Sequence, residues 1–154
     1  MDQLSLNWMD RDISHISHGA LGGSATPRRF LDFEVNGVSL YTKLAALKLD
    51  FISCLGWVGD EFDARSRSTL LIETEGEMRH GRVALYVCPE CVDPLCGSIT
   101  VAITQSPETI EWSSFAYDSG WVGEPDMDVF EEVDGLGPYT FKKSDYRRLL
   151  LQTI

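Results

Sequence analysis

Hydrophobic and polar residues alternate most clearly just after residue 29. Residues 30–35 follow this two-residue period, and the pair Asn36-Gly37 comes next. Such a pair favours a tight turn, because both of its residues accept a positive φ. Residues 38–40 continue the extended pattern on the other side of the turn. The pattern predicts a β-hairpin near the N-terminal end of the folded region.

Three further runs are rich in valine, isoleucine, threonine and aromatic residues, which favour strands. They span residues 82–87, 99–104 and 109–115. A segment rich in cysteine, proline and glycine separates the first two, and a short polar turn separates the last two. The spacing predicts adjacent antiparallel strands.

A helical period starts at about Tyr41. Leu44 and Leu47 repeat at intervals that place them on one helical face, and Ser39 is suited to cap the N-terminus. The next helix breaker is Gly56. We therefore expect a central helix that runs into residues 54–57.

Two other segments carry helical signals of different strength. Residues 60–75 begin with acidic residues typical of a first helical turn, but their hydrophobic pattern leaves helix and strand both open. Near the C-terminus, Ser144 and Asp145 precede a segment in which Tyr146, Leu149 and Leu150 share one face. The chain is expected to end on a helix capped at Ser144 and Asp145.

These elements predict an α+β fold with an antiparallel sheet, an N-terminal hairpin, a central helix and a C-terminal helix. Residues 1–29 are polar and rich in glycine, serine and histidine, so we expect a flexible or loop-rich arm there. Residues 30–154 form a single domain on this interpretation, since 154 residues with 44% hydrophobic content suffice for one core.

Charge and targeting signals narrow the functional classes. The chain has 13 basic and 24 acidic residues, a formal net charge of −11, which disfavours binding to nucleic acid. No apolar run approaches the roughly 20 residues that span a bilayer. The N-terminus also lacks the basic and apolar regions of a secretory signal, so we expect a cytoplasmic protein without membrane contact.

The acidic residues are unevenly distributed. Between Arg82 and Lys142 there is no lysine or arginine, so acidic residues in this interval have no basic neighbour in the sequence. The acidic residues of the interval are Glu90, Asp93, Glu108, Glu111, Asp118, Glu124, Asp126, Asp128, Glu131, Glu132 and Asp134. Such a stretch favours a basic partner.

Three thiols lie within nine residues, at Cys88, Cys91 and Cys96. A Cys-x-x-Cys turn suits tetrahedral zinc, but the fourth ligand would have to come from Cys54 or His80. A redox pair is a further alternative, although a strand rather than a helix is predicted to follow. Reduced thiols packed as small apolar groups are the preferred interpretation, with zinc the only cofactor kept open.

Other chemistry receives little support from the sequence. No phosphate-binding loop and no dinucleotide-binding glycine pattern occurs. His15 and His18 stand in a serine- and glycine-rich stretch typical of solvated loop. Acidic pairs such as Glu131-Glu132 are expected to be solvated, and no catalytic residue is assigned.

The segment from Glu111 to Tyr139 interleaves aromatic and acidic residues, a composition suited to a protein interface. Trp112 and Phe115, on a predicted strand, are expected to belong to the core. Trp121, in a glycine-flanked loop, is expected to anchor a partner. The predicted partner-binding residues are Tyr117, Asp118, Trp121, Glu124, Asp126, Asp128 and Glu131.

The block from Val83 to Leu150, with its Cys88-Pro89-Glu90-Cys91 turn and the Cys96-Gly97 pair, resembles a group of small bacterial proteins of unassigned function, some described as oxidoreductases. The resemblance implies a bacterial origin and a three-thiol turn between strands, and it carries no catalytic residue. In size and acidity the chain is similar in type to bacterial immunity proteins. We therefore expect a non-enzymatic binding protein that neutralises a toxin by occluding it; a small zinc protein and a thiol-dependent oxidoreductase are the alternatives. The oligomeric state and any small ligand stay open.

Overall fold

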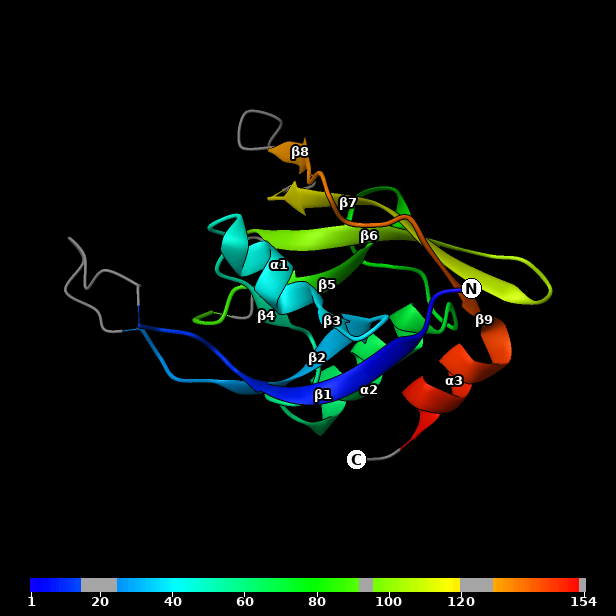
Figure 1. Cartoon of the computed structure of the whole chain (residues 1–154), viewed down its shortest axis with the longest axis horizontal. Helices are drawn as coiled ribbons and strands as arrows, with labels where there is room; N and C mark the ends of the chain where they lie inside the picture. The colour runs from blue at the N-terminus through cyan, green and yellow to red at the C-terminus, as the bar shows by residue number, and fades with distance from the viewer. Residues whose placement is uncertain (15–24, 92–95, 120–128, 153–154) are drawn as a thin grey trace.

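Two antiparallel sheets and three α-helices build the fold, an α+β architecture as the sequence predicted (Figure 1). The computed structural model describes residues 1–14, 25–91, 96–119 and 129–152, and these counts refer to them. Within the same residues, no helix is both long and apolar enough to cross a membrane.

The smaller sheet contains the predicted hairpin. Strands β2 (Arg29–Val35) and β3 (Val38–Ser39) pair antiparallel through a two-residue turn. Both turn residues have positive φ, 53° for Asn36 and 79° for Gly37. This is the backbone conformation for which an Asn-Gly pair is selected, so the hairpin prediction is confirmed.

The third strand of this sheet, β1 (Leu4–Asp10), was not expected. It pairs with β2 over its whole length, from Leu4 opposite Val35 to Asp10 opposite Arg29. The expectation of a loop-rich arm is therefore wrong for residues 4–10. The local sequence shows only weak alternation there, and the ladder to a distant strand stabilises what the composition did not indicate.

The larger sheet confirms the three predicted antiparallel strands and adds three more. Its strand order is β4-β5-β6-β7-β8, and β9 also pairs with β7. The strands are β4 (Ile52–Ser53), β5 (Val83–Val87), β6 (Ser98–Gln105), β7 (Thr109–Asp118), β8 (Phe130–Glu132) and β9 (Tyr139–Lys142). The last two lie where the sequence indicated only acidic loop.

The central helix is shorter than predicted. Ser39 does cap α1 (Leu40–Ala46), accepting a hydrogen bond from the Thr42 backbone N–H at 3.0 Å. The helix ends before Lys48, which has a φ of 65°. The expected extension into residues 54–57 is wrong, because β4 in between pairs with β5 instead.

Two more α-helices follow in the chain. The first lies in the segment for which the sequence left helix and strand both open, and the second starts earlier than expected. Residues 60–75 contain α2 (Asp60–Leu70). The C-terminal helix α3 (Lys143–Leu151) begins one residue before the expected cap, and no side chain caps it. A short 3-10 turn, η1 (Arg79–Gly81), precedes β5.

Trp112 stands at the centre of the core, as predicted for this residue and for Phe115. Its indole contacts Phe33 of the smaller sheet at 5.5 Å between ring centroids and Phe141 of β9 at 5.0 Å. The indole N–H donates to the Tyr146 hydroxyl, which in turn donates to the Leu70 carbonyl. One residue thus joins both sheets to α2 and α3.

A buried carboxylate, Asp32, links the smaller sheet to the larger one. It accepts hydrogen bonds from the hydroxyls of Tyr86 at 2.6 Å and Ser39 at 2.5 Å. Burial raises the pKa of Asp32 in spite of these donors. With its side chain wholly enclosed, this cluster is structural.

Candidate functional site

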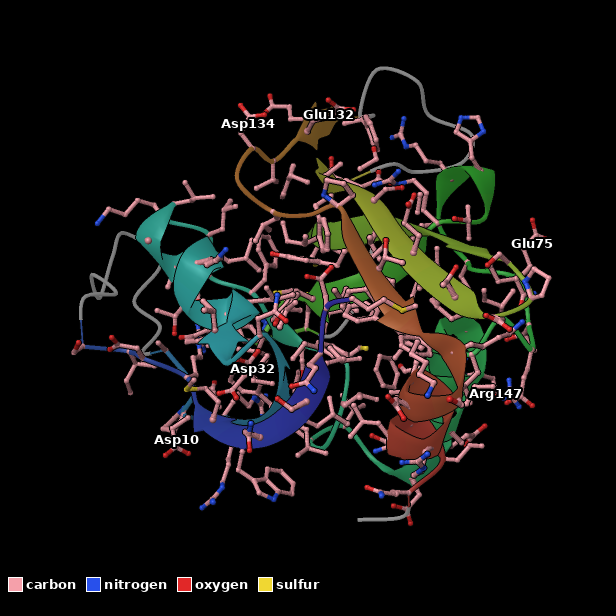
Figure 2. The ribbon with its side chains drawn as sticks, turned by 45° about the vertical axis from the view of Figure 1, so that its right-hand side comes forward. Asp10, Asp32, Glu75, Glu132, Asp134 and Arg147 are labelled. Carbon is pink, nitrogen blue, oxygen red and sulfur yellow. The ribbon has the colours of Figure 1, made fainter. Side chains whose placement is uncertain are left out.

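The outer strand β8 carries an exposed acidic and apolar surface. Phe130, Glu131 and Glu132 are all exposed, and among the described strands β8 pairs with β7 alone. Val129 precedes β8 in the chain and Asp134 follows it, and both are exposed. Figure 2 labels Glu132 and Asp134 on this surface. We call these five residues the acidic edge.

The predicted partner-binding residues are only partly assembled here. Glu131 is exposed and lies opposite half-buried Tyr117 in the strand register. Tyr117 packs against Phe51 at 5.8 Å, so only part of its ring is available. Asp118, the third described member, is buried and lies apart from them. Four predicted residues fall outside the described part of the chain: Trp121, Glu124, Asp126 and Asp128.

Asp118 does not belong to the exposed surface. Its side chain is fully buried and forms an ion pair with Arg79 at 3.1 Å. An exposed role for Asp118 was expected because no basic residue is near it in the sequence. The expectation is corrected by η1, which brings Arg79 to it from 39 residues away.

Two guanidinium groups support the acidic edge from beneath. The guanidinium carbons of Arg79 and Arg82 lie 4.9 Å and 5.0 Å from the centre of the Phe130 ring. At these distances cation–π attraction holds the ring against the sheet. Phe130 therefore fixes β8 to η1 and to Arg82, the residue between η1 and β5. No local pattern in the sequence indicated this connection.

Arg82 is itself bound into the larger sheet. It donates to the Thr100 hydroxyl at 2.9 Å and to the Thr100 carbonyl at 3.1 Å. It also donates to the carbonyl of Ser114, a residue with a φ of 55° next to an irregularity in the β6–β7 ladder. Burial lowers the pKa of Arg82. The support under the acidic edge is therefore rigid.

A second charged cluster holds the cysteine turn. Arg11 contacts Glu90 and Asp50, each at 2.5 Å, and the Thr26 carbonyl at 2.8 Å. Thr26 donates its N–H and its hydroxyl to Glu90. These bonds, those from Thr26 first and that from Arg11 after them, lower the pKa of Glu90 to about 2. Glu90, another acid without basic sequence neighbours, is thus paired across 79 residues.

The turn carries two of the thiols, with Cys88 and Cys91 on either side of Pro89 and Glu90. Cys88 is half-buried, and burial raises its pKa, whereas Cys91 and Cys96 are exposed. All four cysteines are free thiols.

The fourth zinc ligand considered from the sequence is not supplied by Cys54. That thiol is buried, and burial raises its pKa to about 12. Among the residues that the structure describes, no three His, Cys, Asp or Glu side chains are grouped so that they could hold a metal ion. His80 is exposed on η1, while His15 and His18 lie outside the described residues.

A groove of about 800 Å³ lies between β1, the Gly56 loop, α2 and the end of α3. The indoles of Trp8 and Trp57 line it, and each carries a stacked guanidinium, from Arg29 and Arg28 respectively. The sequence did not predict this groove. A tryptophan in a polar segment, Trp8, was a signal that could have pointed to it.

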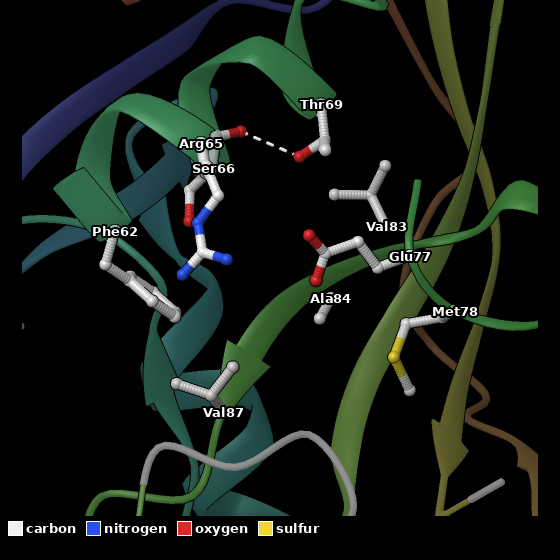
Figure 3. Close-up of a pocket in the computed structure, with 9 residues that line it drawn as sticks. All are labelled: Phe62, Arg65, Ser66, Thr69, Glu77, Met78, Val83, Ala84 and Val87. Atoms are coloured by element: carbon white, nitrogen blue, oxygen red, sulfur yellow. Dashed lines mark hydrogen bonds between the residues drawn. The ribbon is translucent and has the colours of Figure 1, made fainter. Parts of the chain in front are cut away.

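A small pocket of about 50 Å³ opens between α2 and β5. Figure 3 shows Arg65 and Glu77 pointing toward each other over the apolar residues Val83, Ala84 and Val87. Both charged side chains are exposed at its mouth. The volume admits one or two water-sized groups, so the pocket is too small for an organic substrate.

Comparison with known proteins found no matching family model, no matching curated protein and no matching solved structure.

Proposed function

We propose that this chain is a non-enzymatic binding protein, most concretely a bacterial immunity protein that occludes a basic toxin domain. The observation that carries the proposal is the acidic edge: an outer strand that exposes two carboxylates and an aromatic side chain, Glu131 on one face and Glu132 with Phe130 on the other. An exposed strand edge offers backbone groups to a partner, while its side chains determine which partner fits.

The charge of the edge supports a basic partner. Glu131, Glu132 and Asp134 are exposed, and none of these three forms an ion pair within the described residues. The net charge of −11 adds a long-range attraction for cations, which raises the rate of encounter. The carboxylates are thus suited to steer a partner onto the edge.

Phe130 is suited to hold the partner once it has arrived. Phe130 is 37% exposed, and the two guanidinium groups fix the orientation of its ring. A rigid aromatic side chain loses little conformational entropy when it is buried in an interface. The edge therefore combines steering charges with a pre-positioned anchor.

A growth assay tests the proposal. The chain is co-expressed with the product of the neighbouring reading frame, and wild-type protein is expected to relieve the growth inhibition which that product causes. Charge reversal at Glu131→Lys with Glu132→Lys is expected to abolish protection. The matched control reverses Glu108 and Glu111, which are exposed near the other end of β7, and should protect like wild type.

Two outcomes contradict the proposal. Protection by the β8 charge-reversal variant, present as folded protein at wild-type abundance, would remove the acidic edge from the interaction. A neighbouring product that does not inhibit growth would remove the immunity role itself.

A further inference from the structure

The groove between β1, the Gly56 loop, α2 and the end of α3 gathers exposed apolar side chains. Eight large apolar side chains are exposed among the described residues, and three of them line this groove: Trp8, Val58 and Leu151. Its lining also includes three leucines that belong to the core, Leu31, Leu71 and Leu150. An apolar surface of this kind with a polar rim is typical of a binding site.

Hydrogen bonds hold the walls of the groove in place. Asp63 of α2 accepts a hydrogen bond from the Gly56 N–H at 3.0 Å and forms an ion pair with Arg67 at 2.6 Å. Arg67 also donates to the Leu150 carbonyl of α3 at 2.8 Å. The loop and both helices are thus joined to one another. A groove with fixed walls binds a ligand without the entropy cost of assembling them.

β1 adds an open strand edge beside the groove. Backbone hydrogen bonds join Gln3 to Asn36 and Arg11 to Arg28, the pairs just beyond either end of the β1–β2 ladder. Hydrogen-bonded and non-hydrogen-bonded pairs alternate along such a ladder, and Trp8 is an odd number of residues from both Gln3 and Arg11. The backbone N–H and C=O of Trp8 therefore point away from β2. Among the described strands β1 pairs with β2 alone (Figure 1), so these groups lie on an unpaired edge.

The charge of the groove favours a cationic ligand. Its lining contains one guanidinium, that of Arg67, which is paired with Asp63. The other two acids of the lining, Asp60 and Glu73, are exposed, and neither forms an ion pair within the described residues. The guanidinium groups stacked on the two indoles belong to residues that do not line the groove. Two carboxylates at the rim of an apolar surface select basic side chains.

We propose that the groove and the β1 edge bind an extended segment of a second protein that combines apolar with basic side chains. The segment adds a strand to the smaller sheet, exchanges backbone hydrogen bonds with Trp8 and places alternate apolar side chains in the groove. Its basic residues reach Asp60 or Glu73. Another copy of this chain fits less well, because each copy carries a net charge of −11. This site is separate from the acidic edge, which lies on the larger sheet.

The experiment pans a random peptide library displayed on phage against the full chain. We expect the enriched peptides to alternate apolar residues with others and to contain lysine or arginine. Fluorescence polarisation then measures the affinity of a labelled enriched peptide. Trp8→Ala should weaken it by about 30-fold or more, as expected for an aromatic anchor. Asp60→Lys with Glu73→Lys should weaken it by about 5-fold and flatten its salt dependence. Methylation of the peptide's backbone nitrogens should abolish binding, because it removes the donors of a strand.

Val38→Ala is the matched control, because Val38 is an apolar residue of the same sheet, exposed to nearly the same degree as Trp8, that does not line the groove. It should bind the peptide like wild type, and so should Glu131→Lys with Glu132→Lys on the acidic edge. Circular dichroism confirms that each variant is folded. Three results overturn the proposal: no enriched peptide, equal loss of binding in Val38→Ala and Trp8→Ala, or unchanged binding of the methylated peptide. A dimer in sedimentation that Trp8→Ala dissociates would also overturn it, since a second copy would then occupy the groove.

Discussion

This protein has two charged clusters, one under the acidic edge and one at the cysteine turn. In the first the acidic residue is buried, and in the second the basic residue is buried. Under the acidic edge the carboxylate of Asp118 is fully enclosed, and Arg79 is 23% exposed. At the cysteine turn Arg11 is 3% exposed, while its partners Asp50 and Glu90 are 40% and 45% exposed. Removing the buried member therefore leaves a partly enclosed guanidinium in the first cluster and two hydrated carboxylates in the second.

Removing the enclosed carboxylate is expected to have the largest effect. Asp118→Asn should lower the free energy of unfolding by about 3 kcal/mol, because it removes the buried negative charge that faces Arg79 in a partly enclosed site. Chemical denaturation followed by circular dichroism measures the change. A loss below about 1 kcal/mol would show that this pair behaves like an exposed ion pair.

The first cluster also shows where sequence reasoning ended. The hairpin at Asn36-Gly37, the strands around Trp112 and the apolar face of α3 follow from local patterns, and the structure has them. The pairing of Arg79 with Asp118 crosses 39 residues and depends on η1, a turn of three residues with no hydrophobic period. Pairings of this kind arise from tertiary packing, which no local spacing encodes.

The candidate site divides in the same way. The thiol turn between strands is contiguous in sequence, so its residues could be identified in advance. Its Arg11 clamp could not, since β1 gains its stability from pairing with β2 and was expected to be loop. Phe130 lies in an aromatic segment that is visible in the sequence. Its contacts with two arginines could not be predicted, because they form only in the folded chain.

Removing the buried arginine of the second cluster is expected to have a smaller effect than loss of Asp118. Arg11→Met retains most of the side-chain volume and leaves two carboxylates that water can solvate. It should lower the free energy of unfolding by about 2 kcal/mol, for the lost charged hydrogen bonds. Denaturation of both variants in one buffer compares them. If Arg11→Met were destabilised more than Asp118→Asn, the exposure of the charge that remains would not determine the size of the loss.

The smallest expected effect is the pH dependence that Glu90 confers. Its pKa in the folded protein is about 2, below the ordinary value of 4.5, so the folded state holds the charged form. The stabilisation is therefore fully present above pH 4.5 and is lost as the pH falls toward 2. Because Glu90 is exposed, its size should stay below about 1 kcal/mol.

The measurement compares wild type with Glu90→Gln by urea denaturation at pH 7 and at pH 3. Asp32, whose pKa is shifted upward, titrates in the same way in both proteins, so its contribution cancels from the difference. The stability difference between the two proteins should be larger at pH 7 and should shrink at pH 3. A difference that does not change with pH would mean that the pKa of Glu90 is the same in the folded and the unfolded protein. The clamp on the cysteine turn would then depend on hydrogen-bond geometry and not on charge.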